Sequence, residues 1–425
     1  MARNWYKLDN AAKLFPSLYK DSDRNGFRIA AILKEDIQEE ALSDALVETL
    51  KRYPSYCVKL KRGFFWYYFD HNFEKPNIQK ELPVLFSNIQ LYKNNNFLFS
   101  VCINKKRISL DVFHSLGDGT GALEFFKTLC YYYLLNIGKK IDNEEGLIKT
   151  NEIEQAISEV DDSFISNYKK GKSYSKEDKA LSFTGRRYPY NWIGVVHTLI
   201  NLESIKKAAH KYNCTITEYL GACILYSAYE TYFKNQRFDK KKKMKLFIPV
   251  NARKFFDSKT IRNFALYVRT NMDFTSENLI FDDMVNEMKR TFKEELTKEK
   301  LEQRLVQNVK IEKSFIVRIL PLFIKDIAMK IGYNIMGSGA NTLSISNLGA
   351  VKLPKSMEDC IERLEFEIGV SKGTPSNFGV ITFKDTLCFT LTTLLIERKF
   401  ISKIYDCFKR DDVSFYVETN DLEVY

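Results

Sequence analysis

Residues 97–121 read FLFSVCINKKRISLDVFHSLGDGTG and combine two strand patterns, a histidine and the start of a helix. Residues 97–103 and 108–113 predict two strands that are joined by a polar turn at 104–107. From Gly119 onward, apolar residues recur at helical spacing. His114 is therefore predicted at a strand end, against a helix start, with glycines that keep bulk away from its imidazole.

His114 is the candidate general base of the chain. A neutral imidazole takes a proton from a hydroxyl, thiol or amine near neutral pH and returns it to a leaving group. Asp118 has two interpretations. It orients the imidazole, as in a catalytic triad, or it points inward and holds the turn by pairing with a distant arginine, which we favour. The remaining histidines, which lack this glycine context, are His71, His197 and His210.

The elements around this stretch alternate between strands and helices. In the first portion we predict a strand around 27–33, a helix that follows Asp36 as its N-cap, and a strand at 64–69. In the second portion, Thr215 and Glu218 form a capping-box pattern. The other elements predicted there are a strand at 194–201, helices at 202–212 and 215–232, a strand at 245–250, a long charged helix at 281–308, a short strand at 342–346, a hairpin at 378–394 and a helix from 397 to about 409.

Chain length and this alternation set the domain organisation. A chain of 425 residues, with 45% hydrophobic and 14% aromatic residues, exceeds the size at which one core keeps growing. Residues 142–187 are polar and lack clear strands. We therefore predict an α/β fold with mixed sheets in two domains, 1–190 with a linker at about 142–190, and 191–425.

Charge and cysteine usage exclude several classes of function. The net charge is +11, but its densest run, at 240–245, lacks interleaved aromatic residues and favours a solvated loop over a phosphate-binding patch, so no nucleic-acid partner is expected. The eight cysteines are scattered without CxxC or zinc spacing, which indicates buried thiols, a reducing compartment and no metal site. Without a signal-peptide pattern at the start, a cytoplasmic location is expected.

Residues 316–336 have two interpretations. The segment is rich in apolar residues yet carries Arg318, Lys325, Asp326 and Lys330. We favour a core helix of the second portion whose charges face water. The alternative is a basic amphipathic surface helix that makes a peripheral membrane contact or admits a hydrophobic acceptor.

Four stretches carry a resemblance to a known superfamily. HSLGDG at 114–119 matches the HxxxDG motif of the chloramphenicol-acetyltransferase-like superfamily, which includes condensation domains, polyketide-associated acyltransferases and alcohol acetyltransferases. WYKLDNAAKLFPSL at 5–18, IPVNARKFFDSKTIRNF at 248–264 and SISNLGAVKLP at 344–354 resemble segments of the bacterial alcohol-acetyltransferase-like branch. The four stretches follow the expected order over nearly the whole chain.

The resemblance implies two similar subdomains that form a pseudo-dimer with a central tunnel. His114 would lie midway along it, with an acyl thioester of coenzyme A or of an acyl carrier protein on one side and an alcohol or amine acceptor on the other. Asp118, followed by Gly119, would support the site structurally, with Arg253 as its partner. Condensation domains usually have two consecutive histidines, whereas Phe113 precedes His114 here, which favours a free-standing transferase.

The sequence therefore predicts a coenzyme A-dependent acyltransferase in which His114 is the general base and no covalent intermediate forms. Acyl-CoA is a co-substrate, and no permanently bound cofactor is expected. Asn251, Ser346 and Asn347 are candidates for substrate or oxyanion contacts, although we favour a simple strand-ending turn at 346–349. The alternatives are a condensation-type enzyme that acts on carrier-bound substrates and a non-catalytic binding member of the fold.

Overall fold

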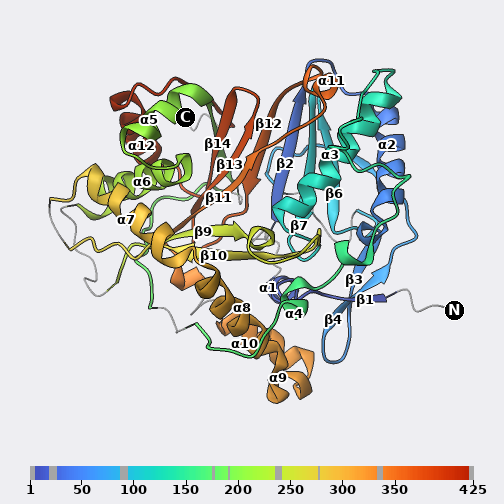
Figure 1. Ribbon diagram of the computed structural model, residues 1–425, viewed down its shortest axis with the longest axis horizontal. Coiled ribbons are helices and arrows are strands. Elements are labelled where there is room, and N and C mark those ends of the chain that lie inside the picture. The colour runs from blue at the N-terminus through green and yellow to red at the C-terminus, as the bar shows by residue number, and fades with distance from the viewer. Residues whose placement is uncertain are drawn as a thin grey trace.

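Three β-sheets organise the computed structural model of the chain (Figure 1). The structure describes residues 5–18, 26–86, 94–174, 178–189, 192–234, 242–275, 278–332 and 338–420. Within these ranges, the sheets have five, seven and three strands, and helices cover the outer sides of the two larger sheets. The mixed α/β fold predicted from the sequence is confirmed.

The five-stranded sheet carries the hairpin from which the prediction began. Its order is β12 (Ile361–Ile368), β2 (Gly26–Leu33), β7 (Arg107–Phe113), β6 (Phe99–Asn104) and β5 (Ile78–Lys80). β6 and β7 pair antiparallel, as predicted. β12, from late in the chain, pairs antiparallel with β2 over the length of both strands. A strand that the sequence did not predict thus completes this sheet.

Two helices, α2 (Glu39–Arg52) and α3 (Gly119–Asn136), pack against each other beside this sheet (Figure 1). α3 begins where predicted, because the Asp118 side chain accepts a hydrogen bond from the Gly121 N–H at 3.0 Å. The prediction of Asp36 as N-cap of α2 is wrong, since the cap is Gln38. The Ile37 N–H still donates to the Lys105 carbonyl at 2.9 Å, so the backbone stays extended past Asp36.

The seven-stranded sheet is built from the second portion. Its order is β10 (Ala265–Arg269), β9 (Leu246–Asn251), β11 (Leu343–Ala350), β13 (Ser376–Phe383), β14 (Thr386–Thr393), β8 (Gly194–Asn201) and β15 (Phe415–Thr419). The predicted hairpin is β13–β14. The favoured turn at 346–349 is wrong, because Ser346 and Asn347 pair in register with Gly379 and Val380 of β13. A register shift after Asn347, with Gly349 at φ +81°, follows within the same strand.

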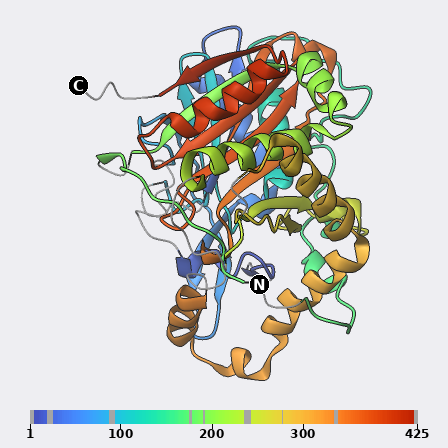
Figure 2. The ribbon, with the colours of Figure 1, turned by 90° about the vertical axis from the view of Figure 1, so that its left-hand side faces the viewer.

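Helices cover one face of this sheet, and Figure 2 looks onto that layer. They are α5 (Leu202–Lys211), α6 (Ile216–Ala228) with a π turn at Tyr229–Phe233, α7 (Phe281–Glu295) and α12 (Lys399–Arg410). The Thr215–Glu218 capping box is present. The single helix predicted at 281–308 is wrong. α7 stops at Glu295 and Thr297 caps a separate helix, α8 (Lys298–Lys313).

The three-stranded sheet pairs β1 (Trp5–Lys7), β4 (Tyr67–His71) and β3 (Val58–Arg62). The predicted strand at 64–69 begins later, at Tyr67, because the Gly63 N–H donates to the Trp66 carbonyl and closes the turn. The remaining elements are short: α1 (Phe15–Leu18), η1 (Pro54–Tyr56), η2 (Ile157–Glu159), α4 (Ser163–Ser166), η5 (Ala252–Lys254), η7 (Ser338–Ala340) and α11 (Lys355–Glu358).

The polar segment 142–187 forms short helical turns and isolated bridges in its described residues. The domain boundary at 190 stays a prediction. β12 belongs to the second portion of the chain but lies in the first sheet, so the sheets do not divide at one point of the sequence. In the lysine run, residues 240 and 241 lie outside the described residues, and Lys243 forms an ion pair with Asp273.

The favoured core interpretation of 316–336 is wrong for the residues described, which end at Gly332. The segment forms α9 (Phe315–Ile319) and α10 (Leu322–Gly332), and most of its large apolar side chains are exposed, although Leu322 is buried. The inward face of α10 instead carries Lys325, which is 3% exposed. No helix among the described residues is long and apolar enough to cross a membrane.

Buried charges link the strands of the five-stranded sheet. Arg28 of β2 forms a bidentate pair with Asp111 of β7, at 2.5 and 2.9 Å, and also contacts Glu81. Arg107 bridges Glu81 and Glu365 of β12. All of these side chains except that of Arg107 are at most 10% exposed. This network fixes β12 against its neighbours through charges as well as backbone pairing.

Candidate active site

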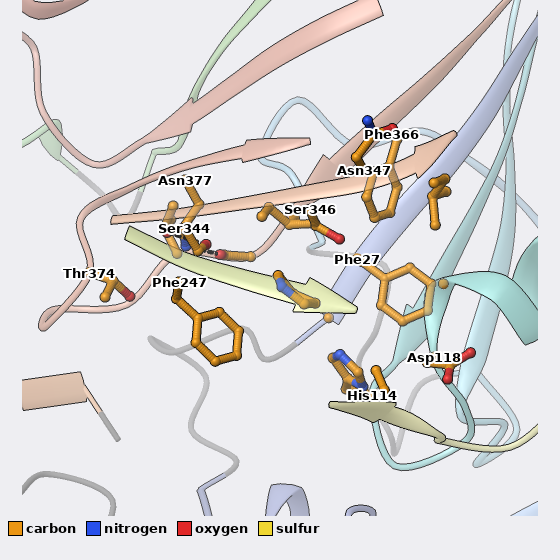
Figure 3. Close-up of a pocket in the computed structure, with 18 of the residues that line it drawn as sticks. Phe27, His114, Asp118, Phe247, Ser344, Ser346, Asn347, Phe366, Thr374 and Asn377 are labelled. Atoms are coloured by element: carbon orange, nitrogen blue, oxygen red, sulfur yellow. Dashed lines mark hydrogen bonds between the residues drawn. The ribbon is translucent and has the colours of Figure 1, made fainter. Parts of the chain in front are cut away.

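A cavity of about 280 Å³ lies between the two large sheets, and His114 forms part of its wall (Figure 3). One side of the cavity comes from the five-stranded sheet and the other from the seven-stranded sheet. The side chains that define it include Phe27, Phe366, Phe247, Ser344 and Ser346. The cavity thus lies between the portion of the chain that carries His114 and the portion that carries Ser346.

Two phenylalanines fix the plane of the His114 ring at the end of β7. The ring of Phe15, on α1, stacks on the imidazole at 4.4 Å with an interplanar angle of 9°. Phe27, on β2, meets it edge to face at 5.2 Å. These contacts leave little rotational freedom for the imidazole, so its nitrogens have defined directions.

Asn263 determines which nitrogen of His114 carries the proton. Its Nδ2 donates to the carbonyl oxygen of His114 at 3.1 Å and to Asp9 Oδ2 at 3.2 Å. Both partners are acceptors, so the amide oxygen Oδ1 faces His114 Nδ1, 3.0 Å away. An amide oxygen only accepts, so Nδ1 is the protonated nitrogen. Nε2 is then the basic nitrogen, and it has no hydrogen-bond partner among the described residues.

Asp9 holds the Asn263 side chain in place. Its side chain is fully buried, Oδ1 accepts from the Ala12 N–H at 2.7 Å, and Oδ2 lies 3.5 Å from Arg262 Nε. Asp9 therefore holds the Asn263 amide, and that amide holds the imidazole. The order Asp9, Asn263, His114 resembles the way a third group orients the base in hydrolytic triads.

Burial lowers the pKa of His114 below its ordinary value of 6.5. Hydrogen bonds that the imidazole donates to its own backbone and to Asn263, and the charge of Asp118, act in the opposite direction but are smaller. The imidazole is therefore neutral at physiological pH. A neutral imidazole with a protonated Nδ1 is the form that accepts a proton at Nε2.

Asp118 points away from the imidazole and pairs with Arg253. Arg253 Nη1 and Nη2 lie 2.9 and 3.1 Å from the two carboxylate oxygens, and the side chains are 12% and 7% exposed. The same oxygens accept from the N–H groups of Gly121 and Phe264, at 3.0 and 2.8 Å. Arg253 also donates to the carbonyls of Thr260 and Arg262. The pair joins the start of α3 to the loop that carries Asn263.

Two glycines allow this close approach. A Cβ on Gly121 would lie 1.8 Å from the carbonyl oxygen of Ile261, which no backbone adjustment of the loop 261–263 accommodates cheaply. A Cβ on Gly119 would lie 2.8 Å from the Leu348 side chain, on the cavity side. Gly119 therefore supports the site by leaving room where α3 meets β11.

The three polar candidates of the second portion all line the cavity, but they differ in their hydrogen bonds. Asn347 Nδ2 donates to Thr217 Oγ1 and its Oδ1 accepts from the Gly349 N–H, so its amide is used within the protein. Asn251 Oδ1 accepts from Arg253, which leaves Nδ2 as its donor group. The Ser346 hydroxyl lies on the side of the cavity toward Phe27 and His114 (Figure 3).

One group of side chains away from this cavity has metal-ligand chemistry. His197, Glu365 and Glu367 are buried and present one ligand atom each within 4.8 Å of one another. Glu365, however, is already bound by Arg107 and by Arg363, whose Nε lies 2.9 Å away. Because guanidinium groups compensate this carboxylate, we assign the group to the buried ion network rather than to a metal centre.

Sequence reasoning missed Phe15, Asp9 and Asn263. All three lie inside the stretches 5–18 and 248–264 that carried the resemblance, so their positions were marked but their roles were not. Asp9 and His114 meet through a residue that is 149 positions further along the chain than His114. Such a contact has no signature in local spacing.

Solved structures with this fold cover nearly the whole chain. Trichothecene 15-O-acetyltransferase TRI3 from Fusarium sporotrichioides is 11% identical, with a TM-score of 0.61 over 96% of this chain and 95% of that one. TRI101 from F. graminearum, complexed with coenzyme A and T-2 mycotoxin, is 11% identical, with a TM-score of 0.58 over 98% and 100%. The first condensation domain of the CDA synthetase is 12% identical, with a TM-score of 0.56 over 97% and 99%. At these identities the similarity establishes the fold.

A comparison with curated protein sequences found no significant match. Residues 136–368 match the sequence family described as alcohol acetyltransferase, and this range is more than half of the chain. It includes Arg253, Asn263 and Ser346, whereas His114 and Asp118 precede it. The chain therefore belongs to the alcohol acetyltransferase family.

Proposed function

We propose that this protein transfers an acyl group from a coenzyme A thioester to an alcohol or amine acceptor, with His114 as the general base. One observation carries the proposal: Asn263 holds Nδ1 of His114, so the basic Nε2 belongs to an imidazole that lines a cavity between two sheets. Burial keeps this imidazole neutral. A residue with only a packing role would not need a fixed tautomer.

The reaction follows from this geometry. Nε2 accepts the proton of the acceptor hydroxyl or amine as its heteroatom attacks the thioester carbonyl carbon. The C=O electron pair moves onto oxygen and returns as the C–S bond breaks. The imidazolium then gives its proton to the departing thiolate, so His114 ends neutral and no bond to the protein forms. Stacking on Phe15 holds the ring through both proton transfers.

Ser346 is the proposed donor to the oxyanion. Its hydroxyl points toward the side of the cavity where Phe27 and His114 lie (Figure 3), and Asn251 Nδ2 is the second candidate. A preorganised donor at the developing negative charge contributes about a hundredfold to a thousandfold to the rate. Asn347 has a supporting role in this proposal, since its amide ties β11 to Thr217 at the start of α6.

The donor assignment draws on relatives of the same fold. One of them is a complex with coenzyme A and T-2 mycotoxin, and another is a condensation domain. The acyl thioester of coenzyme A is the donor we propose here, because Phe113 stands where condensation domains usually have a second histidine. In this proposal the residues before 190 supply His114 and those after 191 supply Arg253 and Ser346, so neither portion alone is active.

The test is release of free thiol from a panel of acyl-CoA donors with alcohols and amines. Thiol release that depends on an acceptor supports the proposal. His114→Ala is expected to lower turnover by about a hundredfold to ten-thousandfold, because it removes the base. His210→Ala, on the exposed side of α5, is the matched control and should retain activity. Full activity of His114→Ala, or transfer only from carrier-bound thioesters, would overturn the mechanism or the donor assignment, respectively.

A further inference from the structure

α9 and α10 meet the β3–β4 turn at one end of the molecule (Figures 1 and 2), and nine exposed apolar side chains belong to these segments. The two segments are joined directly, since the Leu322 N–H donates to the Phe64 carbonyl at 2.8 Å. The exposed fractions of the nine side chains range from 38% to 74%. We call this the apolar end surface, and it consists of Phe64, Phe65, Phe315, Ile316, Ile319, Phe323, Ile324, Ile327 and Ile331.

The helix α10 is amphipathic, but two of its polar residues face the protein and most of its large apolar residues face outward. Its inward face carries Lys325, whose Nζ donates to the Phe65 carbonyl at 2.8 Å and lies 3.6 Å from the centre of the Trp66 ring. Beside it, Asp326 accepts from Ser17 Oγ at 2.6 Å. On the outward face, Phe323 and Ile327 are 57% and 58% exposed. The hydrophobic effect favours the opposite orientation, so the apolar face is kept outside by specific polar contacts.

The charges around the apolar end surface have one sign. On the described part of α9 and α10, the exposed charged residues are Arg318 and Lys330. Lys313, at the end of α8, is exposed as well, and Arg62, at the end of β3, is exposed and pairs with Asp326 at 3.3 Å. The acidic residues of this region turn inward: Asp326 bonds Ser17, and Glu312 is paired with Lys13. Apolar side chains with an outer set of only basic ones match an anionic lipid surface.

We propose that the apolar end surface docks this protein on membranes that contain anionic lipids. α10 has eleven residues, so it lies in the interface rather than crossing the bilayer. One short helix, α1, connects the apolar end surface with the candidate active site. Ser17 of α1 bonds Asp326 of α10, and Phe15 of the same helix stacks on His114. Docking would place the cavity next to the lipid phase.

The test is co-sedimentation of the full chain with vesicles of phosphatidylcholine alone and of phosphatidylcholine with phosphatidylserine. We expect binding to the mixed vesicles that weakens with salt. The variant Phe323→Glu/Ile327→Glu should bind at least about tenfold more weakly, because it removes two apolar side chains that would enter the lipid and adds two negative charges that the anionic lipids repel. Ile157→Glu, at a site that is 87% exposed and outside the surface, should bind as the wild type does.

Melting curves of both variants verify that they fold, and sedimentation of the chain without vesicles measures its oligomeric state. Absence of wild-type binding to either vesicle, or equal binding by Phe323→Glu/Ile327→Glu, would overturn the proposal. A wild-type dimer that the same variant converts to monomer would also overturn it, because a second copy would then cover the surface. Vesicle binding needs no catalysis, so the result is independent of the proposed acyl transfer.

Discussion

Replacing Asp118 by asparagine removes one charge from a nearly buried pair and leaves the shape of the side chain unchanged. The carboxylate now serves four N–H donors, two from Arg253 and two from the backbone of Gly121 and Phe264. An asparagine offers one oxygen and an NH₂ group, so two of the four donors lose their acceptor and the guanidinium loses its counter-charge. Breaking a buried pair in this way costs about 3–5 kcal/mol, a large part of the about 5–15 kcal/mol that stabilises a typical protein.

Urea unfolding followed by tryptophan fluorescence measures this loss as a shift in midpoint. The matched control is Asp406→Asn, which breaks a pair with Lys403 whose side chains are 55% and 37% exposed, and we expect no measurable shift there. In a double-mutant cycle, Asp118→Asn with Arg253→Met should be less destabilised than the sum of the single variants by at least about 1 kcal/mol. Additive effects would refute the reasoning, since the two side chains would then not stabilise the fold through each other.

Three further predictions concern the titrating groups. The kcat/KM of the wild type should rise with pH through a titration below 6.5 and be level at neutral pH, because burial lowers the pKa of His114. Asn263→Ala should lower kcat by about tenfold to a hundredfold and move that titration to still lower pH, because the Asn263 hydrogen bond raises the pKa of His114; an unchanged midpoint would argue against the contact. Burial raises the pKa of Glu367 from 4.5 to about 8, so the folded chain keeps a proton that the unfolded chain releases between these values. The wild type should therefore lose stability relative to Glu367→Gln as pH rises through this interval, with a constant difference above it, and urea midpoints at several pH values measure the trend.

Local patterns were sufficient for the elements that carry the catalytic motif. The β6–β7 hairpin, the start of α3 and the Thr215 capping box depend on neighbours in sequence, and each was predicted where it lies. The favoured turn at 346–349 failed for a different reason. Asn347 and Gly349 are residue types that favour turns. Here they lie at a register shift inside β11, a strand that pairs with β13.

Two features lie beyond sequence reasoning because their causes are tertiary. β12 alternates apolar residues with Arg363, Glu365 and Glu367, a pattern typical of a strand with one face in water, yet Glu365 and Glu367 are buried, and Glu365 is paired with Arg107 of β7. α10 shows the same difficulty in reverse. Its apolar stripe predicts burial, and only the contacts of Lys325 and Asp326 with residues near the start of the chain turn that stripe outward.

The pairing of β12 with β2 also sets the order in which the molecule can be made. Phe27 pairs with Ile368, so almost the whole chain must be synthesised before the first sheet receives its last strand. Until then β2 presents an open edge, the kind of edge that recruits strands of other chains. Contacts this distant in sequence form slowly, because closing so long a loop carries an entropic cost. Phe366 becomes part of the cavity wall in that same late step. His114 is therefore synthesised long before the cavity around it can form. During that interval, aggregation competes with folding.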